Sequence, residues 1–241
     1  MNWVDECDCK FDTLNGRSKV QFFSDLRQHF FHRTLKCCPV SYIGFDTRRV
    51  FSLVGWVQKG DLKIRMNDPE LIRNFTDRFD QWYQENPTPT QQEYDSFHEI
   101  EVEYYYQTLR NLGVFKRKGV QRQSDVAELS EYYNTFAKPY NLLIWHHCFG
   151  KKNGRIEPYP IAENSELFSV LHPAFDSRIF KSMRTILQDL VGVPSTVRIP
   201  KGNKGFTYLR SRDEYTDLLA FYRTEFAKFG QPALVLESFF E

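Results

Sequence analysis

The sequence of this chain lacks the short motifs by which the common catalytic classes are recognised. It contains no phosphate-binding P-loop, no dinucleotide-binding glycine fingerprint, no Gly-x-Ser-x-Gly, no His-Glu-x-x-His and no Cys-x-x-Cys pair. Each motif places backbone N–H groups, a nucleophile or metal ligands at the spacing that its chemistry needs. Their absence argues against the common nucleotide-binding, hydrolase and metalloprotease classes.

The chain also has no long apolar run and no excess of either charge. No stretch approaches the roughly 20 apolar residues that span a bilayer, and residues 1–6 lack the basic-then-apolar order of a signal peptide. Its 32 basic and 31 acidic residues exclude a globally basic nucleic-acid binder, although not a local patch. Five cysteines are an odd number for a disulfide framework. We therefore expect a cytoplasmic protein with reduced thiols and no membrane contact.

Aromatic side chains, in contrast, are abundant. The chain has 22 Phe and 13 Tyr against only 12 Gly. Large flat side chains fill cores, and they also supply stacking surfaces and interface anchors. With 241 residues, the chain can bury a substantial core as one large domain or two small ones.

Periodicity and capping residues divide the chain into helices and short strands. Ser18 opens a helix with apolar residues at helical spacing, and Asp68 followed by Pro69 opens another that ends near residue 85. Further helices are expected over 91–112, 124–136 and 175–191, and strands over 50–57, 62–66, 141–149, 197–199, 206–209 and 235–239. Residues 91–112 also alternate in part like a strand, and a helix is favoured because no turn signal interrupts them.

These elements predict an α+β fold, in which short, mostly antiparallel strands are packed by amphipathic helices. The segment Asn-Pro-Thr-Pro-Thr at 86–90 is the best linker in the chain. It separates an N-terminal α/β module of residues 1–86 from a larger α+β module of residues 91–241. The sequence leaves open whether the two modules pack into one globule.

An apparent internal repeat relates the two modules. Four residues of a strand and its acidic cap recur at a constant offset of 145 residues: Gly60, Ile64, Arg65 and Asp68 match Gly205, Leu209, Arg210 and Asp213. The apolar face of the following helix recurs as well, so both halves have the order helix–strand–strand–helix. Amphipathic helices after short strands also align by chance, which is the alternative to a true duplication.

The first histidine and cysteine group contains the ligand types of a zinc site. Its members are His29, His32, Cys37 and Cys38, and two histidines three residues apart on a helix can share a metal. Adjacent cysteines do not have the usual ligand spacing. The alternative is a helix with two surface histidines and two small buried thiols. We therefore predict no cofactor, with zinc or another divalent metal as the alternative.

A second group, His146 and His147, lies at the end of the most hydrophobic predicted strand. Strand alternation places the two side chains on opposite faces, and ligand sites gather at strand ends. His172 could complete a site in which a histidine acts as general base. These three histidines are the candidate catalytic residues. The alternative is that paired histidines close a core with satisfied hydrogen bonds.

Basic residues cluster in three segments despite the balanced net charge. Residues 116–122 and 151–155 are locally basic, and residues 198–212 hold five cations without an acid. Cations beside aromatic side chains suit phosphate contacts with base stacking. The candidate nucleic-acid-binding residues are Lys116, Arg117, Arg198, Lys201, Lys204, Arg210 and the stacking residue Tyr208. The alternative is a solvated charged face that is balanced by the acidic run over 93–103.

The sequence therefore predicts a cytosolic, non-catalytic binding protein that engages DNA or RNA, or a protein complex that acts on nucleic acid. One alternative is a metal-dependent hydrolase or nuclease that uses the three histidines. The other is a protein-interaction module. Its expected surface anchors are the tyrosines Tyr104, Tyr105, Tyr106, Tyr132 and Tyr133.

Overall fold

The computed structural model describes residues 18–30, 69–111, 128–149, 166–195 and 209–239. Within these residues every regular element is a helix and no strand is present. The predicted α+β class is therefore wrong, and the described part of the protein is helical. The strands expected over 50–57, 62–66 and 197–199 lie outside the described residues. No described helix is long and apolar enough to cross a membrane.

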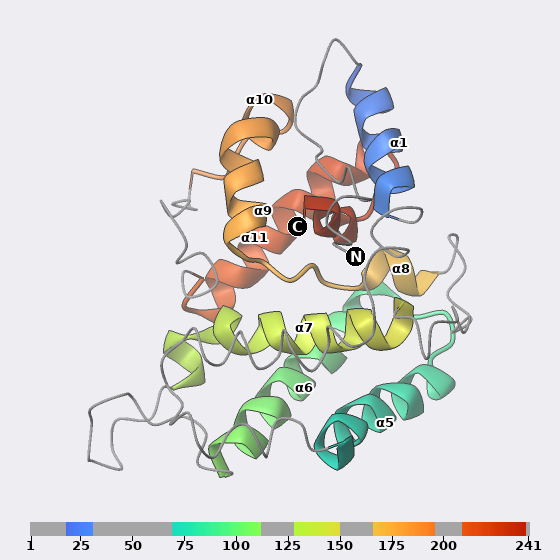
Figure 1. The fold of residues 1–241 in the computed structure, drawn as a ribbon, viewed down its shortest axis with the longest axis vertical. Coiled ribbons are helices and arrows are strands. Elements are labelled where there is room, and N and C mark those ends of the chain that lie inside the picture. The colour runs from blue at the N-terminus through green and yellow to red at the C-terminus, as the bar shows by residue number, and fades with distance from the viewer. Residues whose placement is uncertain (1–17, 31–68, 112–127, 150–165, 196–208, 240–241) are drawn as a thin grey trace, which may run out of the picture.

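The described helices surround one central helix. They are α1 (Lys19–His29), α5 (Pro69–Glu85), α6 (Gln91–Asn111), η3 (Leu129–Glu131), α7 (Tyr133–Phe149), α8 (Glu166–Val170), α9 (Ser177–Ser182), η4 (Met183–Leu187), α10 (Gln188–Leu190), α11 (Arg212–Ala227) and η6 (Ala233–Phe239). Figure 1 shows α7 across the middle, with α5 and α6 below it and α1, α9, α10 and α11 above it.

The helices with one polar face lie where the sequence predicts them. Ser18 caps α1, since its hydroxyl accepts from the Gln21 backbone at 3.2 Å. Helices α5 and α6 flank the linker 86–90, and the strand alternative for 91–112 is wrong. Thr90 opens α6 with a reciprocal cap, in which its N–H donates to Glu93 at 2.7 Å and its hydroxyl accepts from Glu93 N at 3.3 Å.

Helix α7 replaces the strand predicted over 141–149, and this prediction is wrong. Residues 133–145 are buried on every side, and a segment that is apolar on all faces fits a central strand and a buried helix equally well. The strand predicted over 235–239 is wrong for the same reason, because η6 is buried throughout. The helix predicted over 124–136 is interrupted, since η3 ends at Glu131 and α7 begins at Tyr133.

The second copy of the predicted repeat also differs from expectation. Ser211, not Asp213, caps α11, and it forms a capping box with Glu214. Leu209 and Arg210 belong to no strand. Both α5 and α11 do pack against α7, but the strands of the repeat lie mostly outside the described residues. The duplication therefore stays a prediction.

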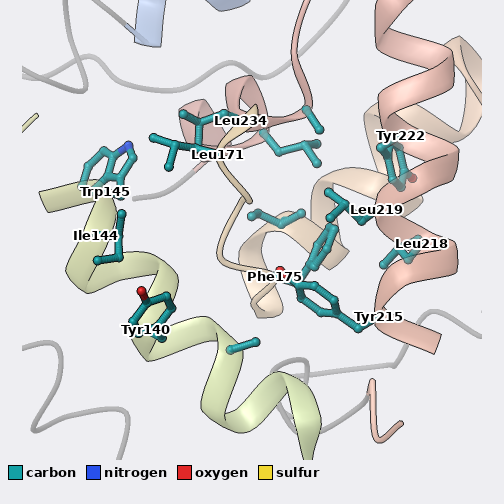
Figure 2. Packing of buried hydrophobic residues seen from close by; sticks show 14 of the residues in the cluster. Tyr140, Ile144, Trp145, Leu171, Phe175, Tyr215, Leu218, Leu219, Tyr222 and Leu234 are labelled. Carbon is teal, nitrogen blue, oxygen red and sulfur yellow. The ribbon is translucent and has the colours of Figure 1, made fainter. Parts of the chain in front are cut away.

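One hydrophobic cluster joins the described helices. Its largest fully buried side chains are all aromatic: Tyr94, Tyr105, Tyr106, Tyr140, Tyr215, Tyr222, Phe22, Phe23, Phe30, Phe75 and Phe79. Figure 2 shows the region where Tyr140 of α7, Phe175 of the connection after α8, and Tyr215 of α11 gather. The cluster contains residues from both sides of the linker 86–90, and the division into two modules stays a prediction.

Candidate functional site: a buried histidine network

Polar side chains from four segments meet inside this aromatic core. They are His98 of α6, Asn141 of α7, Tyr215 of α11 and His172, which lies in the connection of residues 171–176 between α8 and α9. None of the four is more than 5% exposed. The ring centroids of His98 and His172 are 4.0 Å apart. A polar group buried to this extent is costly unless it is hydrogen-bonded, so the partners of these groups decide what they do.

The hydrogen bonds of Asn141 fix the direction of the network. Its Nδ2 donates to the Pro173 carbonyl at 3.0 Å and to Tyr215 Oη at 2.9 Å. Because a carbonyl only accepts, Asn141 Oδ1 must face His98, and His98 Nε2 donates to it across 2.6 Å. The neutral His172 must donate from Nε2 to the Asp95 carboxylate, which only accepts, so its Nδ1 accepts the proton of Tyr215, 3.1 Å away.

The network ends at an ion pair near the surface. His172 Nε2 donates to Asp95 Oδ1 at 2.7 Å, and both terminal nitrogens of Arg223 donate to the Asp95 carboxylate at 2.9 Å. Gln91 Nε2 adds a further bond to Oδ1 at 2.9 Å. The Asp95 side chain is 41% exposed. Each hydrogen bond of the network is thus donated in the direction of the Asp95 carboxylate at the edge of the core. Arg223 balances the negative charge of this carboxylate.

Burial sets the protonation states of the network. Burial lowers the pKa of His98 well below its usual value, and the neighbouring His172 lowers it further. Burial also lowers the pKa of His172 to about 4, against the opposing hydrogen bond to Asp95. Partial burial works to raise the pKa of Asp95, but hydrogen bonds from His172 and Arg223 outweigh it and lower the pKa. At neutral pH the network therefore holds two neutral imidazoles and one carboxylate.

Asp95, His172 and Tyr215 have the carboxylate–imidazole–hydroxyl order of a nucleophilic triad. The Tyr215 side chain is fully buried, however, and its hydroxyl already accepts from Asn141. Both ring nitrogens of His172 are bonded, Nδ1 to Tyr215 in the core and Nε2 to Asp95 at its edge, and the His172 side chain is only 3% exposed, so a bound substrate does not reach either nitrogen. The network holds four segments together, and its chemistry is structural.

The structure separates the described histidines that were predicted to be catalytic. His147 lies near the end of α7, and its Nε2 is 2.7 Å from Asp80 Oδ1 of α5, whereas His172 belongs to the buried network. The side chain of His146 lies outside the described residues. Among the side chains that the structure describes, no group of three or more His, Cys, Asp and Glu could hold a metal ion.

The candidate zinc ligands are only partly covered by the described residues. His29 lies in α1 and is 8% exposed, so the surface position given to it in the alternative interpretation is wrong. His32, Cys37 and Cys38 lie outside the described residues. Cys148, the free cysteine of the described chain, is buried in α7, and this burial raises the pKa of its thiol well above the usual value.

Of the candidate nucleic-acid-binding residues, the structure describes Arg210. Its side chain is exposed, and its backbone is fixed on both sides. Its N–H donates to Glu214 at 2.7 Å, and its carbonyl accepts from Tyr133 N at 2.7 Å. The other candidates lie outside the described residues: Lys116, Arg117, Arg198, Lys201, Lys204 and Tyr208.

The tyrosines expected as surface anchors are mostly interior. Tyr105, Tyr106 and Tyr133 are buried in the core, so the prediction of exposed anchors is wrong for these three. Tyr104 and Tyr132 are half-buried. One face of the Tyr104 ring is occupied, because the Arg78 guanidinium lies 4.1 Å from its ring centroid.

His98, Asp95 and Tyr215 were not predicted as site residues from the sequence. The partners of His172 lie 77 and 43 residues away along the chain, so no local spacing reveals them. One signal was available. His98 and Glu101 fall on the face of α6 that also carries Tyr94, and polar residues at the apolar positions of a helix indicate a buried polar contact.

The charged end of the network borders a surface groove. A groove of ≈ 510 Å³ is lined by Arg223, Gln91, Glu166 and Ser169 together with residues of α1 and of the chain after α11. A hollow of ≈ 440 Å³ shares Gln91, Glu166 and Ser169 with it and reaches the linker at Thr88. Helix α8 therefore forms one wall of a continuous depression beside Asp95.

No protein-family model, curated protein or solved structure matches this chain significantly. The functional proposal below is therefore based on the residues and their geometry.

Proposed function

We propose that the protein is a cytosolic, non-catalytic binding protein that engages nucleic acid through its basic segments. One observation supports this proposal. Two backbone hydrogen bonds join the start of α7 to the residues before α11: Tyr133 N donates to the Arg210 carbonyl at 2.7 Å, and Asn134 N donates to the Leu209 carbonyl at 3.1 Å. Two stretches of chain that are remote in sequence are therefore fixed beside each other on the helical body.

In the sequence, a basic segment precedes each of these stretches. Residues 112–127 carry Lys116 and Arg117 and lead into Glu128, a few residues before Tyr133. Residues 196–208 carry Arg198, Lys201 and Lys204 and lead directly into Leu209. Along the chain, one basic segment therefore precedes each of the two stretches that these hydrogen bonds join. Lysine and arginine contacts with phosphates supply most of the affinity of non-specific nucleic-acid binding.

The two alternatives have less support. The described histidines occupy two separate sites, and both ring nitrogens of His172 are engaged in the core, which disfavours a hydrolase that uses them together. Three of the five tyrosines expected as protein anchors are buried. Arg210, the described member of the candidate nucleic-acid-binding residues, is exposed at the junction of α7 with the residues before α11, which is the observation that favours a nucleic-acid partner.

The proposal is tested by the anisotropy of labelled single-stranded DNA, single-stranded RNA and duplex DNA, titrated with the protein over a range of salt concentrations. We expect binding that weakens steeply with salt. Reversing three charges, Arg198→Glu, Lys201→Glu and Lys204→Glu, should abolish it. Arg210→Glu alone should weaken binding about equally for all sequences and reduce the salt slope by about one.

A matched control is Lys228→Glu, which makes the same charge change at the other end of α11, about 24 Å away along a helix of 16 residues. Lys228 is exposed and pairs with Glu225 at 2.6 Å. Its reversal should leave binding unchanged. Failure of the wild-type protein to retain any of the three nucleic acids at low salt would contradict the proposal.

A further inference from the structure

Several polar contacts hold the buried connection of residues 171–176. Asn141 and Asn134 of α7 donate to the Pro173 and Phe175 carbonyls, and the side chain of His172 adds two further bonds. This residue bonds α6 through Asp95 and α11 through Tyr215. Just before it, the Val170 carbonyl at the end of α8 accepts from Gln91 Nε2 at 3.0 Å and from Arg223 Nη2 at 3.4 Å. The charged cluster of Asp95, Arg223 and Gln91 therefore contributes to the attachment of α8, in addition to its buried residues Leu167 and Phe168.

Protonation of His172 would reverse the direction of its hydrogen bond with Tyr215. Nδ1 of His172 accepts the Tyr215 proton, and a proton on Nδ1 would turn this acceptor into a donor. Tyr215 Oη would then face two donors, Asn141 Nδ2 and His172 Nδ1, and its own proton would lose its acceptor inside the core. A buried donor left without a partner is costly. The cation would also lie against the His98 ring, whose centroid is 4.0 Å away.

We propose that this network is an acid-sensitive latch: protonation of His172 releases residues 171–176 and α8 from α6 and α11, and opens the groove of which α8 is one wall. The latch depends on the described histidine network and is independent of the proposed nucleic-acid binding.

The groups that face His172 have opposing effects on its protonation. From α6, the Asp95 carboxylate favours the imidazolium, while Tyr94 packs edge-on at 5.1 Å and His98 is neutral. From α11, Arg223 opposes a second positive charge, and Tyr215 supplies the hydroxyl. From α7, Asn141 and Tyr140 reach His98 and carry no charge at neutral pH. Burial and Arg223 both disfavour the imidazolium of His172, so His172 is neutral in the closed latch.

The size of the effect follows from linkage. The pKa of His172 is about 4 in the closed latch, and a solvent-exposed imidazole has a pKa of about 6.5. The open state therefore binds more protons below pH 6.5, and opening becomes easier as the pH falls. From His172 alone, the equilibrium constant for opening should rise about 20-fold between pH 7 and pH 5.

Hydrogen exchange followed by mass spectrometry tests the latch in the wild-type chain. After correction for intrinsic exchange rates, amides of residues 167–172 should lose about 20-fold in protection between pH 7 and pH 5, and at pH 5 they should exchange faster than amides of the central part of α7, whose exchange requires wider unfolding. The proton resonance of His172 Cε1, followed by NMR, should titrate in step with this loss. Unchanged protection at pH 5, or a His172 titration that is not accompanied by exchange, would overturn the proposal.

Two variants separate protonation from simple loss of contacts. His172→Gln retains an Nε2 donor for Asp95 and cannot become a cation, so its exchange should lose the dependence on pH in this range. His147→Gln is the matched control, because His147 also bonds an aspartate but lies outside the network. It should behave like the wild type. An acid response of His172→Gln equal to that of the wild type would also overturn the latch, and the wild-type titration decides the matter if this variant does not fold.

Discussion

The imidazoles of His98 and His172 lie 4.0 Å apart in the core, although one belongs to a long helix and the other to a connection. Asn141 and Tyr215 link them through hydrogen bonds with one direction. Two titratable rings at this distance cannot both carry a charge without strong repulsion. The contact is therefore compatible with the neutral forms of both histidines, and it makes the stability of the protein depend on pH.

We expect the free energy of unfolding to fall as the pH drops below about 6.5. The folded-state pKa values of His98 and His172 are lowered, so the unfolded chain binds more protons in this range and stability is lost on acidification. Between pH 7 and pH 4, His172 alone should account for about 3 kcal/mol. Asp95, whose pKa is lowered, adds a further loss only below about pH 4.

Urea unfolding at a series of pH values measures this dependence. His98→Gln should have a shallower pH dependence than the wild type, whereas His147→Gln should keep the wild-type slope. A free energy of unfolding that is constant between pH 6.5 and pH 5 would show that the two histidines are not buried as neutral groups.

Amphipathic periodicity predicted the helices that have one solvent-exposed face. It failed for the segments that are buried on all sides. The pattern that opens at Ser18 and the one that follows Pro69 correspond to α1 and α5. The residues over 141–149 and 235–239 are apolar on every side, and β-branched and aromatic content then favoured strands that the structure replaces by α7 and η6. Propensity was outweighed by tertiary packing around one central helix.

The site could be predicted only by residue type. His172 was predicted to be catalytic because of its residue type. Its role depends on Asp95 and Tyr215, which only the tertiary fold brings next to it. His98 carried a detectable signal, since it occupies an apolar position of α6. The basic segments were identified from charge alone, and the sequence contained no sign that Arg210 and Tyr133 would be joined through their backbones.

Glu237→Gln should stabilise the protein at neutral pH. Glu237 is 1% exposed in η6, and burial raises its pKa to about 8. The unfolded chain releases this proton near pH 4.5, so the folded state binds more protons between pH 4.5 and pH 8 and stability falls as the pH rises through that range. A neutral glutamine can still accept from the Ala174 N–H, and we expect a gain of about 1–3 kcal/mol at pH 7.

Unfolding of the wild type and of Glu237→Gln should be compared at pH 5, 7 and 8. The difference between them should grow with pH. Glu131→Gln is the control, because Glu131 is exposed and the same substitution there should change stability little. A constant difference at all three values would mean that the Glu237 carboxyl is not buried as an acid.

Lys138→Met should strongly destabilise the protein. Lys138 Nζ lies 3.4 Å from Asp176 Oδ2, and both side chains are less than 10% exposed. Removing the cation leaves a buried carboxylate without its counter-charge, which costs about 3–5 kcal/mol. Asp176→Asn in the same background should restore most of this loss, since asparagine still caps α9. A double variant as unstable as Lys138→Met would show that charge is not the cause.

Two tyrosines offer a paired test of the network, since both are fully buried and differ in their hydrogen bonds. Tyr215 Oη bonds Asn141 and His172, whereas Tyr140 Oη has no hydrogen-bond partner among the described residues. Tyr215→Phe leaves His172 Nδ1 and one N–H of Asn141 without a partner and should cost about 1–3 kcal/mol, whereas Tyr140→Phe removes an unpaired hydroxyl and should be neutral or stabilising by about 1 kcal/mol. Thermal and urea unfolding measure both variants. Because the two substitutions remove the same atom from equally buried rings, their difference isolates the hydrogen bonds, and equal effects would show that Tyr215 is not bonded as described.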